Sequence, residues 1–332
     1  MKLRHKSSHI PCKNLSTLVW EGDHLVDATT SQRLELDGTF SRSEFLIGFP
    51  FDRAISLRDA SALWAVTYDN RGTKALLFRN GKAVRELNRS LYHAKAFDYP
   101  MTLTKTASGR GVIVHCPRDY DELIFEDAET GEILGAKKSE NMEFHSRLAV
   151  SPDGGFLVSA GWFWHPLNGA WLCPISDITG MSGRPPKEAD FSFGFGAEID
   201  SVAFLQNDHL VVATSAEIVN DEVPANGLGP LRLGVWSIGD DRWNSTVEIG
   251  QVAGAIMPWR DWVISFYEHP KAIELATGAV VHSWEHIYSG RQIGAIDLGE
   301  PAPPPIALDP VGGRFAIAGQ DGVAVITLEC AP

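Results

Sequence analysis

The chain has 332 residues, of which 44% are hydrophobic and 21% charged, and its formal net charge is -13. This composition is ordinary for a globular protein with a full core and unlike that of a disordered or membrane-spanning chain. The acidic balance argues against broad nucleic-acid binding, which needs a surplus of Lys and Arg, and suits solubility or a basic protein partner.

The cysteines and the N-terminus bear on location. No CxxC spacing occurs, so neither a disulfide framework nor a zinc cluster is predicted from Cys12, Cys116, Cys173 and Cys330. The basic residues at the N-terminus are followed by polar residues 7–9, where a signal peptide would need an apolar run, and no stretch approaches membrane-spanning length. We therefore expect a cytoplasmic protein that contacts no membrane.

Along the chain, pairs of short apolar stretches are joined by Pro, Gly, Asn or Asp turn residues, as in strand hairpins. In chain order they occupy 25–36, 75–87, 123–134, 148–161, 202–214, 233–243, 271–284 and 306–322. Two hairpins make one four-stranded sheet, and the sheet recurs every roughly 40–60 residues, the period of propeller blades. The pattern predicts an all-β protein, a β-propeller of about seven four-stranded blades.

The repeat divides the chain into blades and two terminal segments. The blades are placed at 53–90, 95–138, 143–190, 198–250 and 252–290, with 15–37 and 304–329 left over. The two ends form separate blades, giving seven, or share one, giving six; seven is preferred. Because the last segment supplies about three strands, an N-terminal strand is expected to complete its sheet and close the ring. We expect a single domain over 1–332, with 1–14 as a flexible segment.

Two short motifs carry a resemblance to a known family. Ser151-Pro152-Asp153-Gly154 matches the turn between the first two strands of a blade, and Val235-Trp236-Ser237 takes the place of a Trp-Asp dipeptide. On these motifs the chain resembles the WD-repeat β-propeller family and its divergent bacterial relatives. It departs from the family in having Ser237 in place of Asp. The resemblance implies an architecture more than a function.

In such a propeller, loops between blades share one face with the loops that join second and third strands. Four segments on adjacent blades map to that face: 88–93, 115–120, 145–147 and 161–166. Their aromatic, His and Arg side chains suit recognition of a partner, because aromatic faces give rigid contact area and Arg gives planar hydrogen bonding. The candidate binding residues are Arg89, Tyr92, His93, Arg118, Asp119, Tyr120, His145, Arg147, Trp162, Trp164 and His165.

Each candidate has a structural alternative. His93 and His145 could instead hydrogen-bond within their blades, as WD-like inter-blade His residues do, and the Trp residues could pack between sheets. A second set from later blades, Glu268 and His269, reaches the same face if the ring is closed; the alternative is that both are simply solvated.

Catalytic signatures are weak. His282 and His286 fit an HxxEH pattern, but on a strand they would lie roughly 13 Å apart, too far for one metal ion. No metal, cofactor or catalytic residue is therefore expected. The favoured function is a monomeric, non-catalytic protein-binding scaffold, with an inhibitor or immunity-type partner of a basic protein as one form of it. The alternative is an enzyme or small-ligand receptor with its site at the mouth of the propeller channel.

Overall fold

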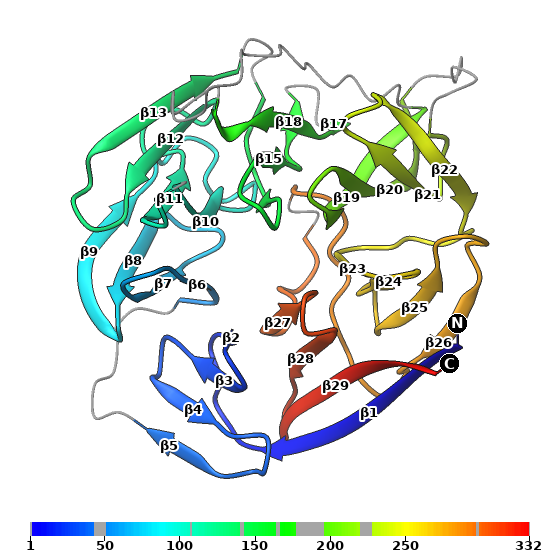
Figure 1. The fold of residues 1–332 in the computed structure, drawn as a ribbon, viewed down its shortest axis with the longest axis horizontal. Helices are drawn as coiled ribbons and strands as arrows, with labels where there is room; N and C mark the ends of the chain where they lie inside the picture. The colour runs from blue at the N-terminus through cyan, green and yellow to red at the C-terminus, as the bar shows by residue number, and fades with distance from the viewer. Residues whose placement is uncertain are drawn as a thin grey trace.

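Seven blades of β-sheet stand around a central axis in the computed structural model (Figure 1). The structure describes residues 2–42, 51–106, 108–139, 143–163, 167–176, 196–219, 228–296 and 299–331. Within these residues six blades are four-stranded sheets, and one blade has a three-stranded sheet beside a two-stranded hairpin. The expected all-β propeller is confirmed, and seven blades are present, as preferred over six.

The first four blades follow in chain order. Blade 1 contains β2 (Val19–Glu21), β3 (His24–Asp27), β4 (Gln32–Leu34) and β5 (Phe40–Arg42). Blade 2 contains β6 (Arg53–Arg58), β7 (Leu63–Tyr68), β8 (Lys74–Arg79) and β9 (Lys82–Asn88). Blade 3 contains β10 (Met101–Lys105), β11 (Gly111–His115), β12 (Glu122–Asp127) and β13 (Ile133–Lys138). Blade 4 contains β14 (Leu148–Val150), β15 (Phe156–Ser159) and β18 (Trp171–Pro174), with a side hairpin of β16 (Trp162–Phe163) and β17 (Leu167–Asn168).

The last three blades complete the ring. Blade 5 contains β19 (Ala197–Gln206), β20 (His209–Ile218), β21 (Arg232–Ser237) and β22 (Arg242–Glu248). Blade 6 contains β23 (Ile256–Trp259), β24 (Trp262–Ser265), β25 (Lys271–Glu274) and β26 (Val280–Ser283). Blade 7 contains β27 (Ile306–Asp309), β28 (Arg314–Ala318), β29 (Gly322–Ala331) and the N-terminal β1 (Lys2–Pro11).

The tight turns explain why the blade boundaries could be predicted. Between β8 and β9, Asn80 and Gly81 both have positive φ, +49° and +77°, as a two-residue hairpin turn requires. Between β14 and β15, Asp153 accepts hydrogen bonds from the Ser151 hydroxyl (2.6 Å) and the Gly155 amide (3.0 Å). These side chains fix the hairpins locally, so the strand starts follow from the turn residues.

The ring is closed by β1, which pairs antiparallel with β29 over its whole length, from Lys2↔Ala331 to Pro11↔Gly322. An N-terminal closing strand was expected, but the expectation that 1–14 is flexible is wrong, because residues 2–11 are that strand. Its side chains are mostly exposed, since β1 is the outermost strand of blade 7. Strand β1 is held mainly by its backbone hydrogen bonds to β29. Because its side chains are mostly exposed, its sequence shows no alternation of apolar and polar residues.

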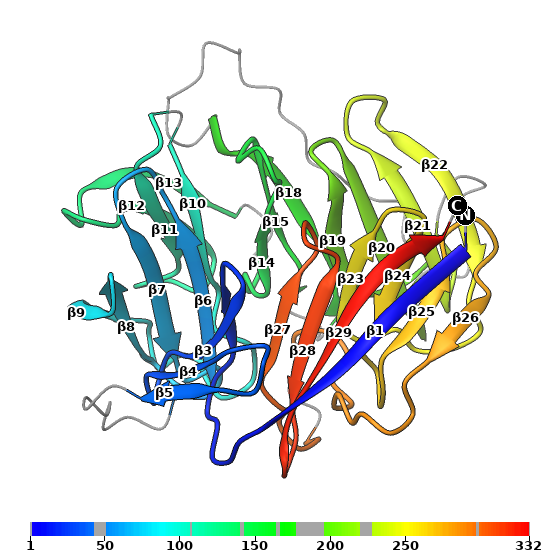
Figure 2. The same cartoon turned by 60° about the horizontal axis from the view of Figure 1, so that its bottom comes forward.

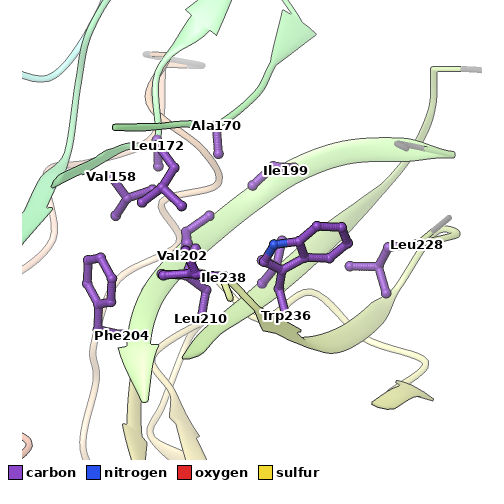
Figure 3. Packing of buried hydrophobic residues seen from close by; sticks show 12 residues of the cluster. Val158, Ala170, Leu172, Ile199, Val202, Phe204, Leu210, Leu228, Trp236 and Ile238 are labelled. Atoms are coloured by element: carbon purple, nitrogen blue, oxygen red, sulfur yellow. The ribbon is translucent and has the colours of Figure 1, made fainter. Parts of the chain in front are cut away.

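The core lies between neighbouring blades. Figure 3 shows one such layer, in which Val158 and Leu172 of blade 4 face Ile199, Val202 and Leu210 of blade 5. Trp236, in the place of the family's Trp-Asp dipeptide, is buried in the same cluster. Among the described residues, clusters of this kind join blade 2 to 3, 3 to 4, 4 to 5, 5 to 6, 6 to 7 and 7 to 1. Across the described ranges, the chain forms no helix with the length and apolar character needed to cross a membrane.

Candidate functional site

The loops that carry the candidate residues lie at one end of the ring, called the loop end, where each blade's innermost strand begins. The opposite end, where first and second strands are joined, is called the turn end. In Figure 2 the turns after β2 and β27 lie at the upper, turn end, and the orange connection between β26 and β27 lies at the lower, loop end.

Four predicted or neighbouring aromatic rings stack at the loop end and form an aromatic column. Tyr92 stacks on Tyr120 with ring centroids 5.3 Å apart, Tyr120 on Phe144 at 4.0 Å, and Phe144 on Trp162 at 4.1 Å. The rings come from the β9–β10 loop, the β11–β12 turn, the loop before β14, and β16. Three loops and a hairpin of blades 2 to 4 thus share one rigid stack.

The inner end of the column is fixed by backbone pairing. Phe144 and Trp162 exchange two backbone hydrogen bonds, of 2.8 and 3.2 Å. A Cβ at Gly161 would lie only 2.0 Å from the Phe144 carbonyl oxygen, so this approach requires glycine. Phe144 and Trp162 are buried. The burial of Trp162 supports the alternative that this side chain packs between sheets over the one that it contacts a partner.

The outer end of the column is exposed. Leu91 is 86% exposed and Tyr92 48% exposed. Arg118 and Asp119 are also exposed, in the same turn as Tyr120, and His93 is exposed beside Tyr92. Burial raises the pKa of Tyr120, and the charge of Asp121 raises it further, so its hydroxyl stays protonated at neutral pH. We call Leu91, Tyr92, His93, Arg118, Asp119 and Tyr120 the docking patch.

Arg89 is not on that surface, although it was expected to contact a partner. It is buried, and its guanidinium donates to the carbonyls of Gly72 (2.7 Å) and Ala94 (2.6 Å) while lying over the Phe97 and Tyr99 rings at 4.7 Å. Burial lowers its pKa to about 10, which leaves it charged. Arg89 holds the β9–β10 loop in shape, because loop carbonyls turned inward need a donor.

His145 is likewise buried, which favours its structural alternative. Its Nδ1 lies 3.2 Å from the Ser159 hydroxyl, and its backbone N–H donates to the Tyr120 carbonyl at 3.2 Å. Burial lowers its pKa to about 3, so the ring is neutral at physiological pH. A buried neutral imidazole of this kind positions loops and has no surface to offer a partner.

The centre of the loop end is crossed by the β26–β27 connection, whose described residues, 284–296 and 299–305, are called the strap (Figure 1). The Gly294 amide donates to the Asp200 carboxylate at 3.0 Å, and the Ala295 amide donates to the Asn168 side chain at 3.0 Å. Gln292 donates to Asp98 at 2.5 Å. The strap thus joins blades 6 and 7 while bonding to residues of blades 4 and 5 and of the loop that enters blade 3.

Arg147 belongs to this centre rather than to the docking patch. Its guanidinium donates to the carbonyls of Asp200 and Ala160, the latter at 3.4 Å. Asp200 is fully buried, and burial raises the pKa of its carboxyl, although Arg147 and the Gly294 amide act in the opposite direction. Arg147 and Asp200 therefore form the charged support on which the strap rests.

The remaining candidates divide into two groups. Glu268 forms an ion pair with Arg291 at 3.0 Å at the start of the strap, and His269 follows it, half-buried, in the same turn. Trp164 and His165 lie outside the described residues. The ion pair of Glu268 therefore connects it to the strap.

Several residues of this end were missed from the sequence. Phe144 could have been found, since it directly precedes the predicted His145, and Leu91 stands beside the predicted Tyr92. Asp98, Asn168 and Asp200 carry no local signal, because their partners in the strap are far away in the chain. Among the described residues, no three or more His, Cys, Asp or Glu side chains are grouped so as to hold a metal ion. His282 of the HxxEH pattern packs instead against His5, with ring centroids 4.3 Å apart.

No family model matches the chain, and no curated protein matches it. Solved structures do. The Neurospora crassa Pan2 WD40 domain is 13% identical, with a TM-score of 0.53 over 94% of this chain and 88% of that one. A streptogramin B lyase is 11% identical, with a TM-score of 0.55 over 98% of both chains. At these identities the likeness shows the fold alone: the chain is a seven-bladed β-propeller.

Proposed function

We propose that this propeller is a non-catalytic protein-binding scaffold whose partner docks on the docking patch. The observation that carries the proposal is the outer end of the aromatic column, where Leu91 and Tyr92 are exposed above rings fixed in the core. Large side chains held rigid before binding lose little entropy when a partner covers them, and aromatic anchors of this kind dominate binding energies. Arg118 and Asp119 supply a polar rim.

The strap supports binding over chemistry at this end of the ring. It lies across the channel mouth, where a propeller enzyme would gather its reacting groups, and the Asp98 and Asp200 carboxylates are already occupied by strap donors. His145, which could serve as a base elsewhere, is buried and neutral. The likeness to a WD40 domain agrees with a scaffold.

The net charge and the free cysteines suggest the kind of partner and the cellular location. The net charge of -13 favours a basic partner and, with it, an inhibitor or immunity-type role, and the propeller acts as a monomer. The four cysteines are free thiols, which stay reduced in the cytoplasm, where we place this function. Binding to nucleic acid or membrane is not part of the proposal.

Two exposed apolar residues allow a matched test. Leu91 at the loop end is 86% exposed and Val311 at the turn end is 87% exposed. Proteins captured from cell extract by the wild type would be purified and titrated against the wild type, Leu91→Asp and Val311→Asp. The proposal predicts that Leu91→Asp weakens binding about tenfold or more and that Val311→Asp leaves it unchanged. Equal loss in both variants would refute it.

The alternative function, a small-ligand receptor or enzyme at the channel mouth, has one observation in its favour. A cavity of about 120 Å³ lies between the strap and blade 2, lined on one side by Arg53, Asn70 and Arg71 and on the other by Gln292 and Glu300. Arg71 is paired with Asp98 at 3.1 Å. Thermal stabilisation by small carboxylates that disappears in Arg71→Gln would favour this function over the scaffold.

A further inference from the structure

A second, larger cavity lies inside the ring and is separate from everything described above. It has a volume of about 580 Å³ and is bounded by the innermost strands of four blades, β2, β6, β10 and β27, and by the turns that follow two of them. We call it the chamber. Most of its lining is apolar, including Val19, Ile55, Leu103 and Leu308.

The chamber reaches the turn end of the ring. Its lining includes Gly22, in the turn after β2, and Pro310, in the turn after β27. None of its lining residues belongs to the docking patch or to the strap. Leu308 and Val311, at and beside this end, are exposed. The chamber is thus reached from the side of the ring opposite the proposed protein-docking surface.

One wall of the chamber is rigid and polar at defined points. The Trp20 indole N–H donates to the Ala307 carbonyl at 3.2 Å, and the Arg314 guanidinium covers the Trp20 ring at 4.1 Å. The Ser56 hydroxyl donates to the Trp20 carbonyl at 3.1 Å. Since contacts from blade 7 hold the Trp20 ring and a contact from blade 2 holds its backbone, the wall is formed before any ligand arrives.

The charges at the chamber neutralise one another. Among the described lining residues, only Asp309 and Arg314 carry charge, and they form an ion pair at 2.7 Å. Arg314 also pairs with Asp23 at 3.2 Å and donates to the Gly22 carbonyl. A charged ligand would lose its hydration without gaining an unpaired counter-charge, so this lining selects against it.

Hydrogen-bonding capacity is present without charge. The four innermost strands each pair with only one neighbour, so their other edge, with its backbone N–H and C=O groups, faces the channel. The Thr102 and Ser56 hydroxyls add to it. Ligand sites in proteins have volumes of about 300–1,000 Å³, a range that includes the chamber.

We propose that the chamber binds an uncharged, mainly apolar small molecule that has one or two hydrogen-bonding groups. The apolar part of such a ligand packs against the apolar side chains of the chamber. Its polar groups hydrogen-bond to the backbone N–H and C=O groups of the strand edges. This site is separate from protein docking, because the chamber and the docking patch share no residue.

Two fluorescent probes of similar size test the charge selection. N-phenyl-1-naphthylamine is uncharged, and 1-anilinonaphthalene-8-sulfonate adds a sulfonate to nearly the same ring system. The folded wild type should bind the uncharged probe, with a rise in its fluorescence, about tenfold or more tightly than the sulfonate. No binding of the uncharged probe, or equal affinity for both, would overturn the proposal.

Filling the chamber tests the location. Ala54→Phe places a ring into the cavity, and Ala83→Phe makes the same change on the exposed outer strand of blade 2. Ala54→Phe should lower the affinity for the uncharged probe about tenfold or more, and Ala83→Phe should leave that affinity unchanged. Thr102→Phe fills the chamber from blade 3 and serves if Ala54→Phe does not fold. Unchanged probe affinity in a folded, filled variant would contradict the assignment. Protein capture by the docking patch should be normal in all these variants.

Discussion

The docking patch and the centre of the loop end use the same kinds of residue for opposite purposes. In the centre, Arg89 and His145 are buried and bonded to backbone carbonyls or a hydroxyl, and Arg147 supports the strap through Asp200. In the docking patch, Tyr92 and Arg118 stand exposed. Arg89 and Tyr92 are only three positions apart, so burial, not residue type, decides which side chain is free for a partner.

This contrast also explains how the patch stays rigid. The aromatic column runs from exposed Tyr92 to buried Trp162, and the buried end is bonded to the backbone of the loop before β14. We therefore expect the interior residues to matter for stability and, under the proposed function, the exposed ones for binding. The following predictions separate the two roles, from the largest expected effect to the smallest.

The largest effect is expected in the buried middle of the column. Phe144→Ala removes a fully buried ring that contacts Tyr120 and Trp162. The free energy of unfolding should fall by about 3–5 kcal/mol through lost burial and the cavity left behind. Urea unfolding followed by circular dichroism measures it, and a loss below about 1 kcal/mol would show that the column is not part of the core.

The strap support should be the next most sensitive. Asp200→Ala leaves the buried amides of Gly254 and Gly294 without their acceptor and removes the counter-charge of Arg147. We expect a loss of about 2–4 kcal/mol. Hydrogen exchange should show the Gly294 amide becoming unprotected. A protected amide in a stable variant would contradict the role given to Asp200.

The buried His145 predicts a pH dependence of stability. Its folded pKa is lowered to about 3, so below the unfolded value of about 6.5 the unfolded chain takes up a proton that the folded protein refuses. The contribution of His145 to the free energy of unfolding is constant above pH 6.5 and is lost as the pH falls toward 3. The loss between pH 6.5 and pH 5 should be about 2 kcal/mol. His145→Gln should reduce the slope of stability against pH in this window; an unchanged slope would show that His145 titrates normally.

The smallest stability effect is expected at the exposed end. Tyr92→Ala removes a half-exposed ring at the outer end of the column. The free energy of unfolding should change by less than about 1 kcal/mol, because surface positions contribute little. Thermal unfolding of Tyr92→Ala and Phe144→Ala, measured side by side, checks this expectation. A loss of stability in Tyr92→Ala as large as in Phe144→Ala would make Tyr92 a core residue.

The fold was largely predictable because blade turns are specified locally. Residues 151–154 and Asn80-Gly81 mark hairpins whatever surrounds them. The closing strand β1 was taken for a flexible segment because its outermost position leaves its side chains exposed and unpatterned. Register with β29 depends on residues more than 300 positions away, which no local signal encodes.

The grouping of several candidate residues was predictable, but their burial was not. Ring topology brought Tyr92, Tyr120 and Trp162 together as expected, but it does not say which side chains point inward. Arg89 hydrogen-bonds to a loop carbonyl and His145 to a serine hydroxyl. The need of these buried groups for a hydrogen-bond partner can be seen only in the three-dimensional structure. The strap bonds join residues as far apart as Asp98 and Gln292, 194 positions in sequence.

The most direct test of the scaffold proposal is photo-crosslinking in living cells from one position at each end of the ring. A photo-reactive amino acid would replace Tyr92 at the docking patch or Val311 at the turn end, both exposed. The proposal predicts a discrete protein adduct from position 92 that is absent from position 311 and lost on adding Leu91→Asp. An adduct from position 311 alone, or the same adduct from both, would contradict docking at the aromatic column.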